Sequence, residues 1–155
     1  LQGDMPFVAP SVVRAGIDLL AAHPECDIAT VVEREASPAV RTNPDMVKAV
    51  LAMAPDGRSG RALYFTRSVL YGDAPVWHHH GVYAYRREAL RRFTAAPPSP
   101  LETREKLEQL RALEAGWRIA VALPPSPFPP GVDTPEDLAR AERIFMEQAS
   151  GNDHG

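Results

Sequence analysis

The sequence alternates short apolar segments rich in β-branched residues with longer segments whose apolar residues recur at helical spacing, and this alternation restricts the fold to few classes. The predicted strands lie at 28–32, 47–53, 61–65, 81–85 and 117–123. The predicted helices lie at 10–22, 87–94 and 100–115, with a last helix beginning at 135. This pattern predicts the α/β class with an open sheet, in which ligands bind beyond the carboxyl ends of the strands.

Length and composition narrow the class further. The 155 residues predict one core, which we expect to comprise a single α/β domain at 1–149 and a flexible tail at 150–155. Seventeen Lys and Arg against 20 Asp and Glu give a net charge of −3, so no basic excess indicates a nucleic acid or an anionic membrane as partner. Cys26 is the only cysteine, which excludes an internal disulfide and fits the cytoplasm. A small-molecule ligand is therefore expected.

Turn-forming and helix-capping residues predict where several helices, strands and loops begin and end. Turn-forming residues at 54–60 between two apolar segments predict a β-hairpin. The segment 34–43, rich in Ser, Pro and charge, is predicted to be a loop. Ser99 followed by Pro100 and Glu102 is a capping box, and it predicts one helix that runs to about 115 and stops at Gly116.

Two aspartates far apart in sequence lie at predicted turns. Asp4 follows Leu1, Gln2 and Gly3 as if at the end of a strand, and Asp133 precedes the last helix. A turn aspartate often only accepts backbone hydrogen bonds, and negative charge is favoured near a helix N-terminus in any case. As a pair, the two carboxylates suggest a shared divalent cation.

Other polar residues have both a functional and a structural interpretation. Successive side chains of a strand point to opposite faces, so His79 is predicted to face away from His78 and His80, and the three cannot easily converge on one zinc ion. Arg67 after an apolar strand suits a carboxylate or phosphate, or is a charge on an edge strand. Glu108 and Gln109 are ordinary surface residues of an amphipathic helix by periodicity alone.

Six segments in series resemble one family, CMP-Kdo synthetase (3-deoxy-manno-octulosonate cytidylyltransferase). They are LQGD at 1–4, NP at 43–44 with VK at 47–48, LYFTR at 63–67, HHGVYAYR at 79–86, PSPLE at 98–102 with LEQLR at 107–111, and GVDTPED at 131–137. Each segment alone is weak, but their order and spacing over nearly the whole chain are specific.

The resemblance implies a Rossmann-like nucleotide-diphospho-sugar transferase fold, a mixed sheet flanked by helices. It implies a cytoplasmic enzyme, homodimeric in the full-length family, that joins CTP to the sugar acid Kdo for lipopolysaccharide biosynthesis. Asp4 and Asp133 would bind Mg²⁺. The sugar-acid pocket would be lined by Gln2, Tyr64, Arg67, His79, Glu108 and Gln109.

The chain also departs from the family pattern. Met5 stands where Glu is usual, and His80 where Ile or Leu is usual. The Gly-rich basic loop that holds the CTP phosphates in the family has no counterpart, so we expect a C-terminal portion of a cytidylyltransferase that is inactive in isolation. Two alternatives stay open: a cytidylyltransferase for the 8-amino analogue of Kdo, and an inactive truncated fragment retaining only sugar-binding or dimerisation surfaces.

Overall fold

The computed structural model describes residues 5–70, 72–125, 128, 131–132 and 135–151, with the side chains of the last helix described as far as Met146. Contacts within the chain define two compact units, Ala9–Pro127 on one hand and Leu1–Val8 with Phe128–Gly155 on the other. The single domain expected for 1–149 stays a prediction.

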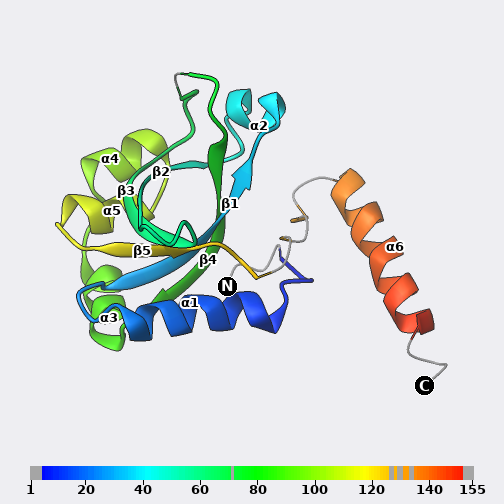
Figure 1. Cartoon of the computed structure of the whole chain (residues 1–155), viewed down its shortest axis with the longest axis horizontal. Coiled ribbons are helices and arrows are strands. Elements are labelled where there is room, and N and C mark those ends of the chain that lie inside the picture. The colour runs from blue at the N-terminus through cyan, green and yellow to red at the C-terminus, as the bar shows by residue number, and fades with distance from the viewer. Residues whose placement is uncertain (1–4, 71, 126–127, 129–130, 133–134, 152–155) are drawn as a thin grey trace. The chain divides into compact units, whose positions relative to one another are not determined.

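The larger unit follows the predicted alternation (Figure 1). Its elements are α1 (Pro10–Ala22), β1 (Ile28–Glu35), α2 (Pro38–Thr42), β2 (Lys48–Met53), β3 (Ser59–Thr66), β4 (Val76–Tyr85), α3 (Arg87–Ala95), α4 (Pro100–Glu105), α5 (Gln109–Glu114) and β5 (Ile119–Ala122). The smaller unit contains α6 (Pro135–Gly151), which extends two residues into the predicted tail. The remaining tail residues, 152–155, lie outside the described residues.

The mixed sheet is confirmed, but the expectation of an open sheet is wrong. The strand order β1-β4-β2-β3-β5 closes into a barrel, because β5 is paired along both of its edges. It runs parallel to β1, with Ile28 opposite Ile119, and antiparallel to β3, with Ser59 opposite Ala122. Every other pairing in the ring is antiparallel. Hydrogen-bonding partners at both edges decide closure, and sequence alternation does not reveal them.

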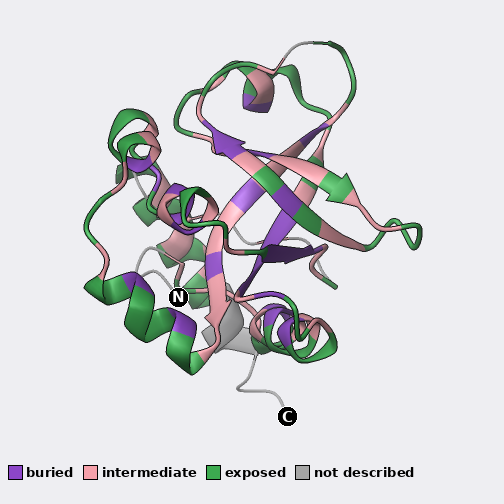
Figure 2. Cartoon of the chain, turned by 90° about the vertical axis from the view of Figure 1, so that its left-hand side faces the viewer, coloured by how far each residue is buried: buried purple, intermediate pink, exposed green. Residues whose placement is uncertain are grey.

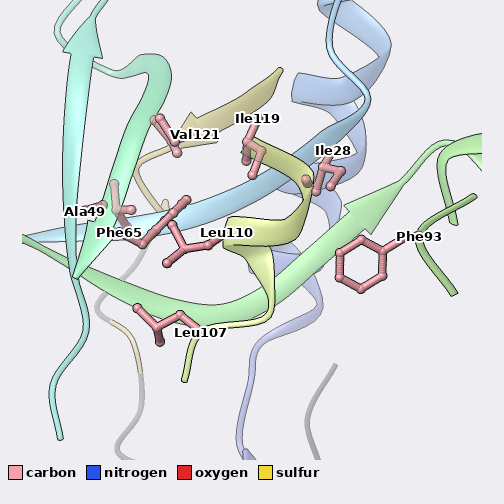
Figure 3. Close-up of a cluster of buried hydrophobic side chains, with 11 residues drawn as sticks. Ile28, Ala49, Phe65, Phe93, Leu107, Leu110, Ile119 and Val121 are labelled. Atoms are coloured by element: carbon pink, nitrogen blue, oxygen red, sulfur yellow. The ribbon is translucent and has the colours of Figure 1, made fainter. Parts of the chain in front are cut away.

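Hydrophobic clusters lie on two faces of the strands, and the buried residues concentrate along them (Figure 2). Alternate residues of β5 face opposite ways: Ile119 and Val121 join the larger cluster, whereas Ala120 joins a smaller one with Leu20 of α1. The larger cluster contains Ile28, Val32, Ala49, Ala62, Phe65, Phe93, Leu107, Leu110, Ala112, Ile119 and Val121 (Figure 3). Helical residues thus pack against both faces of the strands, which agrees with burial on both faces of a strand.

Local signals explain two boundaries. The β2–β3 hairpin is confirmed: Gly57 adopts a positive φ of 63°, and the Asp56 carboxylate accepts hydrogen bonds from the backbone N–H groups of Arg58 and Ser59. The predicted loop at 34–43 is wrong, because β1 continues to Glu35 and α2 occupies Pro38–Thr42. The missed signal is the N-cap pair Ser37 and Pro38, in which the Ser37 hydroxyl accepts from the Ala39 N–H.

The capping box at Ser99 and Glu102 is confirmed, but the single helix predicted after it is wrong. Lys106 adopts the left-handed conformation, with φ 55° and ψ 47°, and ends α4. In an unbroken helix Glu102 and Arg111, nine residues apart, would be separated by about 13 Å along the axis. The break brings them into direct contact, and the second helix ends as predicted at Gly116, whose φ is 78°.

The Glu102–Arg111 pair joins three helices. Arg111 Nε donates to Glu102 Oε2 at 2.7 Å and Arg111 Nη2 to Oε1 at 2.5 Å, while Nη1 donates to the carbonyls of Phe93 and Ala96 at the end of α3. Hydrogen bonding by Arg111 lowers the pKa of the Glu102 carboxyl, and Glu102 raises the pKa of Arg111.

We expect Glu102→Gln to lower the free energy of unfolding at pH 7 by about 2 kcal/mol, the scale of a charge-assisted hydrogen bond. Because the folded pKa lies below the unfolded value, this stabilisation is complete above the unfolded pKa and disappears as pH falls through the folded pKa. Urea unfolding of both proteins between pH 7 and pH 3 should show the difference shrinking below about pH 4.5.

Glu88→Gln is the matched control, since Glu88 forms an exposed pair with Arg91 at 3.6 Å. It should change stability by less than about 0.5 kcal/mol. A Glu102→Gln effect no larger than this control would contradict the structural role of the pair.

Candidate functional site

Three of the predicted site residues, Gln2, Asp4 and Asp133, lie outside the described residues. The proximity of the two aspartates, and hence the shared cation, stays a prediction. In the part of the chain that the structure describes, no group of three or more His, Cys, Asp or Glu side chains is arranged to hold a metal ion.

His79 is buried at the centre of an aromatic group. Its ring packs edge-on against Phe65, with 4.8 Å between ring centroids, and lies 5.4 Å from Tyr83. Its backbone N–H donates to the Val47 carbonyl at 2.8 Å, and its Nε2 lies 3.0 Å from Thr30 Oγ1. Burial, with smaller contributions from His80 and His78, lowers the pKa of His79 to about 3. The ring is therefore neutral at pH 7 and acts as a hydrogen-bonding group.

The other two histidines behave as the strand geometry predicts. The rings of His78 and His80 lie 4.4 Å apart, on the face of β4 opposite to His79. His80 Nε2 lies 3.4 Å from Glu33 Oε2, yet burial and His78 lower the pKa of His80 to about 3. The family departure at His80 therefore lies on the far face of the strand from His79.

Two tyrosines extend the ring contacts of His79 to Phe93 of α3: Tyr83 contacts His79, and Tyr85 contacts Phe93. Tyr83 and Tyr85 have ring centroids 5.9 Å apart. Burial raises the pKa of Tyr83 and raises that of Tyr85 to about 12, and the negative charge of Glu108 raises both further. Both phenols thus keep their protons, and Glu108 lies close enough to act on them. Sequence reasoning did not select Tyr83; its even spacing from His79 in a strand was the available signal.

Glu108 and Gln109 owe their placement to the helix break at Lys106. Glu108 is exposed at the N-terminal boundary of α5, whereas Gln109, the first residue of α5, is buried with 5% exposure. The surface-helix interpretation therefore fails for Gln109.

Tyr64 contacts the end of α4. Its hydroxyl donates to Glu105 Oε1 at 3.3 Å, and the Thr66 hydroxyl donates to Glu105 Oε2 at 3.2 Å. Glu105 thus links β3 to α4, although the sequence did not indicate this role.

Arg67 is held by the loop before β2. Its Nη1 donates to the carbonyls of Pro44 at 3.0 Å and Asp45 at 3.5 Å, while its buried Nε has no hydrogen-bond partner among the described residues. The ammonium of the fully buried Lys48 donates to the carbonyls of Arg67 and Asn43, at 2.7 and 2.9 Å. Burial, followed by the nearby charge of Arg67, lowers the pKa of Lys48. Lys48 therefore orients the residue that carries the guanidinium.

The described site residues have contacts in different parts of the larger unit. His79 packs against Tyr83, and the charge of Glu108 acts on Tyr83, whereas Arg67 hydrogen-bonds to the 44–45 loop and Tyr64 to Glu105. A cavity of about 280 Å³ lies at the other end of β3, beside Ser59, Arg61 and Arg118, and contains no predicted site residue. Convergence of the sugar-acid residues on one pocket stays a prediction.

No helix among the described residues is both long enough and apolar enough to cross a membrane. The described geometry combines a mixed sheet covered by helices with a buried cation, a neutral imidazole, phenols and a carboxylate. It defines the chain as a mixed α/β protein.

The chain belongs to the cytidylyltransferase family, whose family model matches residues 1–119. It is 54% identical over 152 residues to the 3-deoxy-manno-octulosonate cytidylyltransferase of Rhodospirillum centenum (strain ATCC 51521 / SW), covering 97% of this chain and 58% of that protein. It is 53% identical over 150 residues to the protein of that name from Parvibaculum lavamentivorans (strain DS-1 / DSM 13023 / NCIMB 13966), covering 96% and 57% respectively.

A solved structure of CMP:2-keto-3-deoxy-manno-octonic acid synthetase complexed with CTP is similar, with a TM-score of 0.83 and 33% identity. The match covers 96% of this chain and 61% of that one. These comparisons confirm the family resemblance and the α/β class. The chain spans somewhat less than three-fifths of the length of the two relatives.

Protonation of His79 should make stability depend on pH. Its folded pKa is about 3 and the unfolded value about 6.5, so below pH 6.5 the unfolded state binds a proton that the folded state does not. We expect the free energy of unfolding to fall as pH falls from about 6.5, by up to about 1.4 kcal/mol per pH unit for this histidine.

The measurement is urea unfolding at pH 7.5 and pH 5.5 for the unmodified chain and for His79→Gln. The variant should lose less stability between the two pH values, because it lacks one of the groups that titrate only in the unfolded state. An equal loss in both proteins would mean that His79 protonates in the folded state.

Proposed function

We propose that the chain carries the sugar-acid-binding part of a 3-deoxy-manno-octulosonate cytidylyltransferase, which joins CTP and Kdo into CMP-Kdo and pyrophosphate for lipopolysaccharide biosynthesis. The observation that carries the proposal is the 54% identity over 97% of this chain to a relative of that name. The described polar residues fit such a ligand, because Kdo has one carboxylate and several hydroxyls.

In this proposal Arg67 binds the Kdo carboxylate. Within the part of the chain that the structure describes, its buried Nε lacks an acceptor, and a carboxylate at that edge of the guanidinium would supply one. His79, Glu108, Gln109, Tyr64 and Gln2 bind hydroxyls, for which neutral imidazole, carboxylate, amide and phenol are suitable partners.

The reaction needs no protein nucleophile. The anomeric hydroxyl of Kdo loses its proton to water as its oxygen forms a bond to the α-phosphorus of CTP, the bond from that phosphorus to the bridging oxygen breaks, and pyrophosphate leaves with the electron pair. The contribution of this chain is to orient the sugar for in-line attack. Asp4 and Asp133 are proposed to hold Mg²⁺, since two carboxylates suit this ion, and bound Mg²⁺ would neutralise phosphate charge.

For the whole protein we infer a cytoplasmic homodimer with CTP and Kdo as its small-molecule partners. A free, buried Cys26 whose thiol pKa is raised by burial fits a reducing compartment.

Arg67→Ala should weaken Kdo binding about tenfold or more, because a charge-assisted hydrogen bond contributes roughly 1.5–3 kcal/mol. Isothermal titration of the purified chain with Kdo measures this directly. Arg61→Ala is the matched control: it removes an exposed arginine from the other end of the same strand and should leave Kdo affinity unchanged. Equal affinity of Arg67→Ala and the unmodified chain would contradict the assignment, and parallel titration with the 8-amino analogue separates the two sugars.

The purified 155-residue chain should bind Kdo yet release no measurable pyrophosphate from CTP with excess Mg²⁺. Its sequence has no Gly-rich basic loop to hold the triphosphate, and each missing oxyanion donor costs roughly 10²–10³ in rate. A version extended to the full length of its relatives is the positive control. Comparable turnover by both proteins would mean that this chain holds a complete nucleotide site.

A further inference from the structure

Thr30 occupies an irregular place in the β1–β4 ladder. Thr30 pairs with Tyr83 and Val31 with His80, so Gly81 and Val82 of β4 are left without partners on β1. Thr30 is 1% exposed, and its hydroxyl lies within this bulge. A buried hydroxyl in a bulge must find partners among groups that the regular ladder would otherwise use.

The direction of each hydrogen bond of Thr30 follows from its one proton. The Val82 carbonyl, 2.7 Å from Thr30 Oγ1, can only accept, and the more distant His80 carbonyl, at 3.4 Å, can also only accept. Thr30 therefore donates its only hydroxyl proton to a backbone carbonyl. Towards His79 Nε2, at 3.0 Å, the same oxygen can then only accept, so the proton of that contact belongs to the imidazole.

We propose that Thr30 is a positioning residue that fixes His79 in the tautomer protonated at Nε2, leaving Nδ1 as a hydrogen-bond acceptor for the ligand. The ring orientation is held from the other sides by Phe65, at 4.8 Å, and Tyr83, at 5.4 Å, so the imidazole cannot exchange its two nitrogens without leaving this packing. Burial keeps the ring neutral, as its lowered pKa indicates, and a neutral ring carries one proton only.

The consequence for recognition rests on the proposed function. An acceptor at Nδ1 favours a ligand group that donates, such as a sugar hydroxyl, and disfavours a carbonyl or carboxylate oxygen at the same place. Thr30 would therefore select the polarity of the group next to His79 without touching the ligand.

The tautomer can be measured without any ligand. Long-range ¹H–¹⁵N correlation spectra of the histidine-labelled chain distinguish a protonated ring nitrogen from a bare one. We expect His79 in the unmodified chain and in Thr30→Ser to carry its proton on Nε2. In Thr30→Val, which keeps the shape of the side chain but loses the acceptor, we expect a mixture of tautomers or the form protonated at Nδ1.

Thr66→Val is the matched control. It also removes a buried threonine hydroxyl, one that donates to Glu105, and should leave the His79 tautomer unchanged. If Thr30→Val does not fold, Thr30→Ala replaces it. A proton on Nδ1 in the unmodified chain, or the same tautomer when Thr30 is Val or Ala, would overturn the proposal.

Titration with Kdo then tests the link to recognition. Thr30→Val should bind about tenfold more weakly than the unmodified chain, and Thr30→Ser should restore most of the affinity. Absence of Kdo binding to the unmodified chain would refute the proposed function while the tautomer result still decides the role of Thr30. If Thr30→Val changes the His79 tautomer as expected but leaves the Kdo affinity unaltered, only the proposed effect of Thr30 on ligand recognition would be refuted.

Discussion

The pairing of Glu102 with Arg111 is the interaction on which the arrangement of α3, α4 and α5 depends. It forms only because the chain turns at Lys106, and it brings the end of α3 to the same arginine. The turn also delivers Leu107 and Leu110 to the hydrophobic cluster against Phe65 (Figure 3). Glu108 and Gln109 lie between these two leucines, so core packing and the placement of polar side chains have one origin.

Adjacent histidines of β4 face two different chemical environments. His79 faces an aromatic group and a threonine hydroxyl, whereas the tilted rings of His78 and His80 contact each other on the opposite face near Glu33. Burial keeps His79 and His80 uncharged at neutral pH, so the cluster contributes hydrogen-bonding directions and little charge. The positive charge belongs instead to Lys48, at the start of β2, and Arg67, just after β3. The ammonium of the buried Lys48 donates to the Arg67 carbonyl.

Much of the fold was predictable because its signals are local. Helix α1, the β2–β3 hairpin and the capping box at Ser99 all agree with their predicted positions. The errors are long-range: the helix break needs Arg111 to reach Glu102, and closure of the barrel needs partners on both edges of β5. For the site, alternation along β4 correctly separated His79 from its neighbours, but nothing local connected it to Thr30, 49 positions away.

By itself, the sequence determined the order of most helices and strands, several of their caps and the resemblance to the family, because side-chain periodicity, turn residues and motif spacing are properties of neighbouring positions. Only the tertiary structure decided that the sheet closes and that Gln109 is buried. It also decided that His79 is a neutral ring beside the Thr30 hydroxyl, which donates its proton to the Val82 carbonyl. The physical reason is that burial and hydrogen-bond direction depend on which distant residues share a space, and that is settled only when the elements pack.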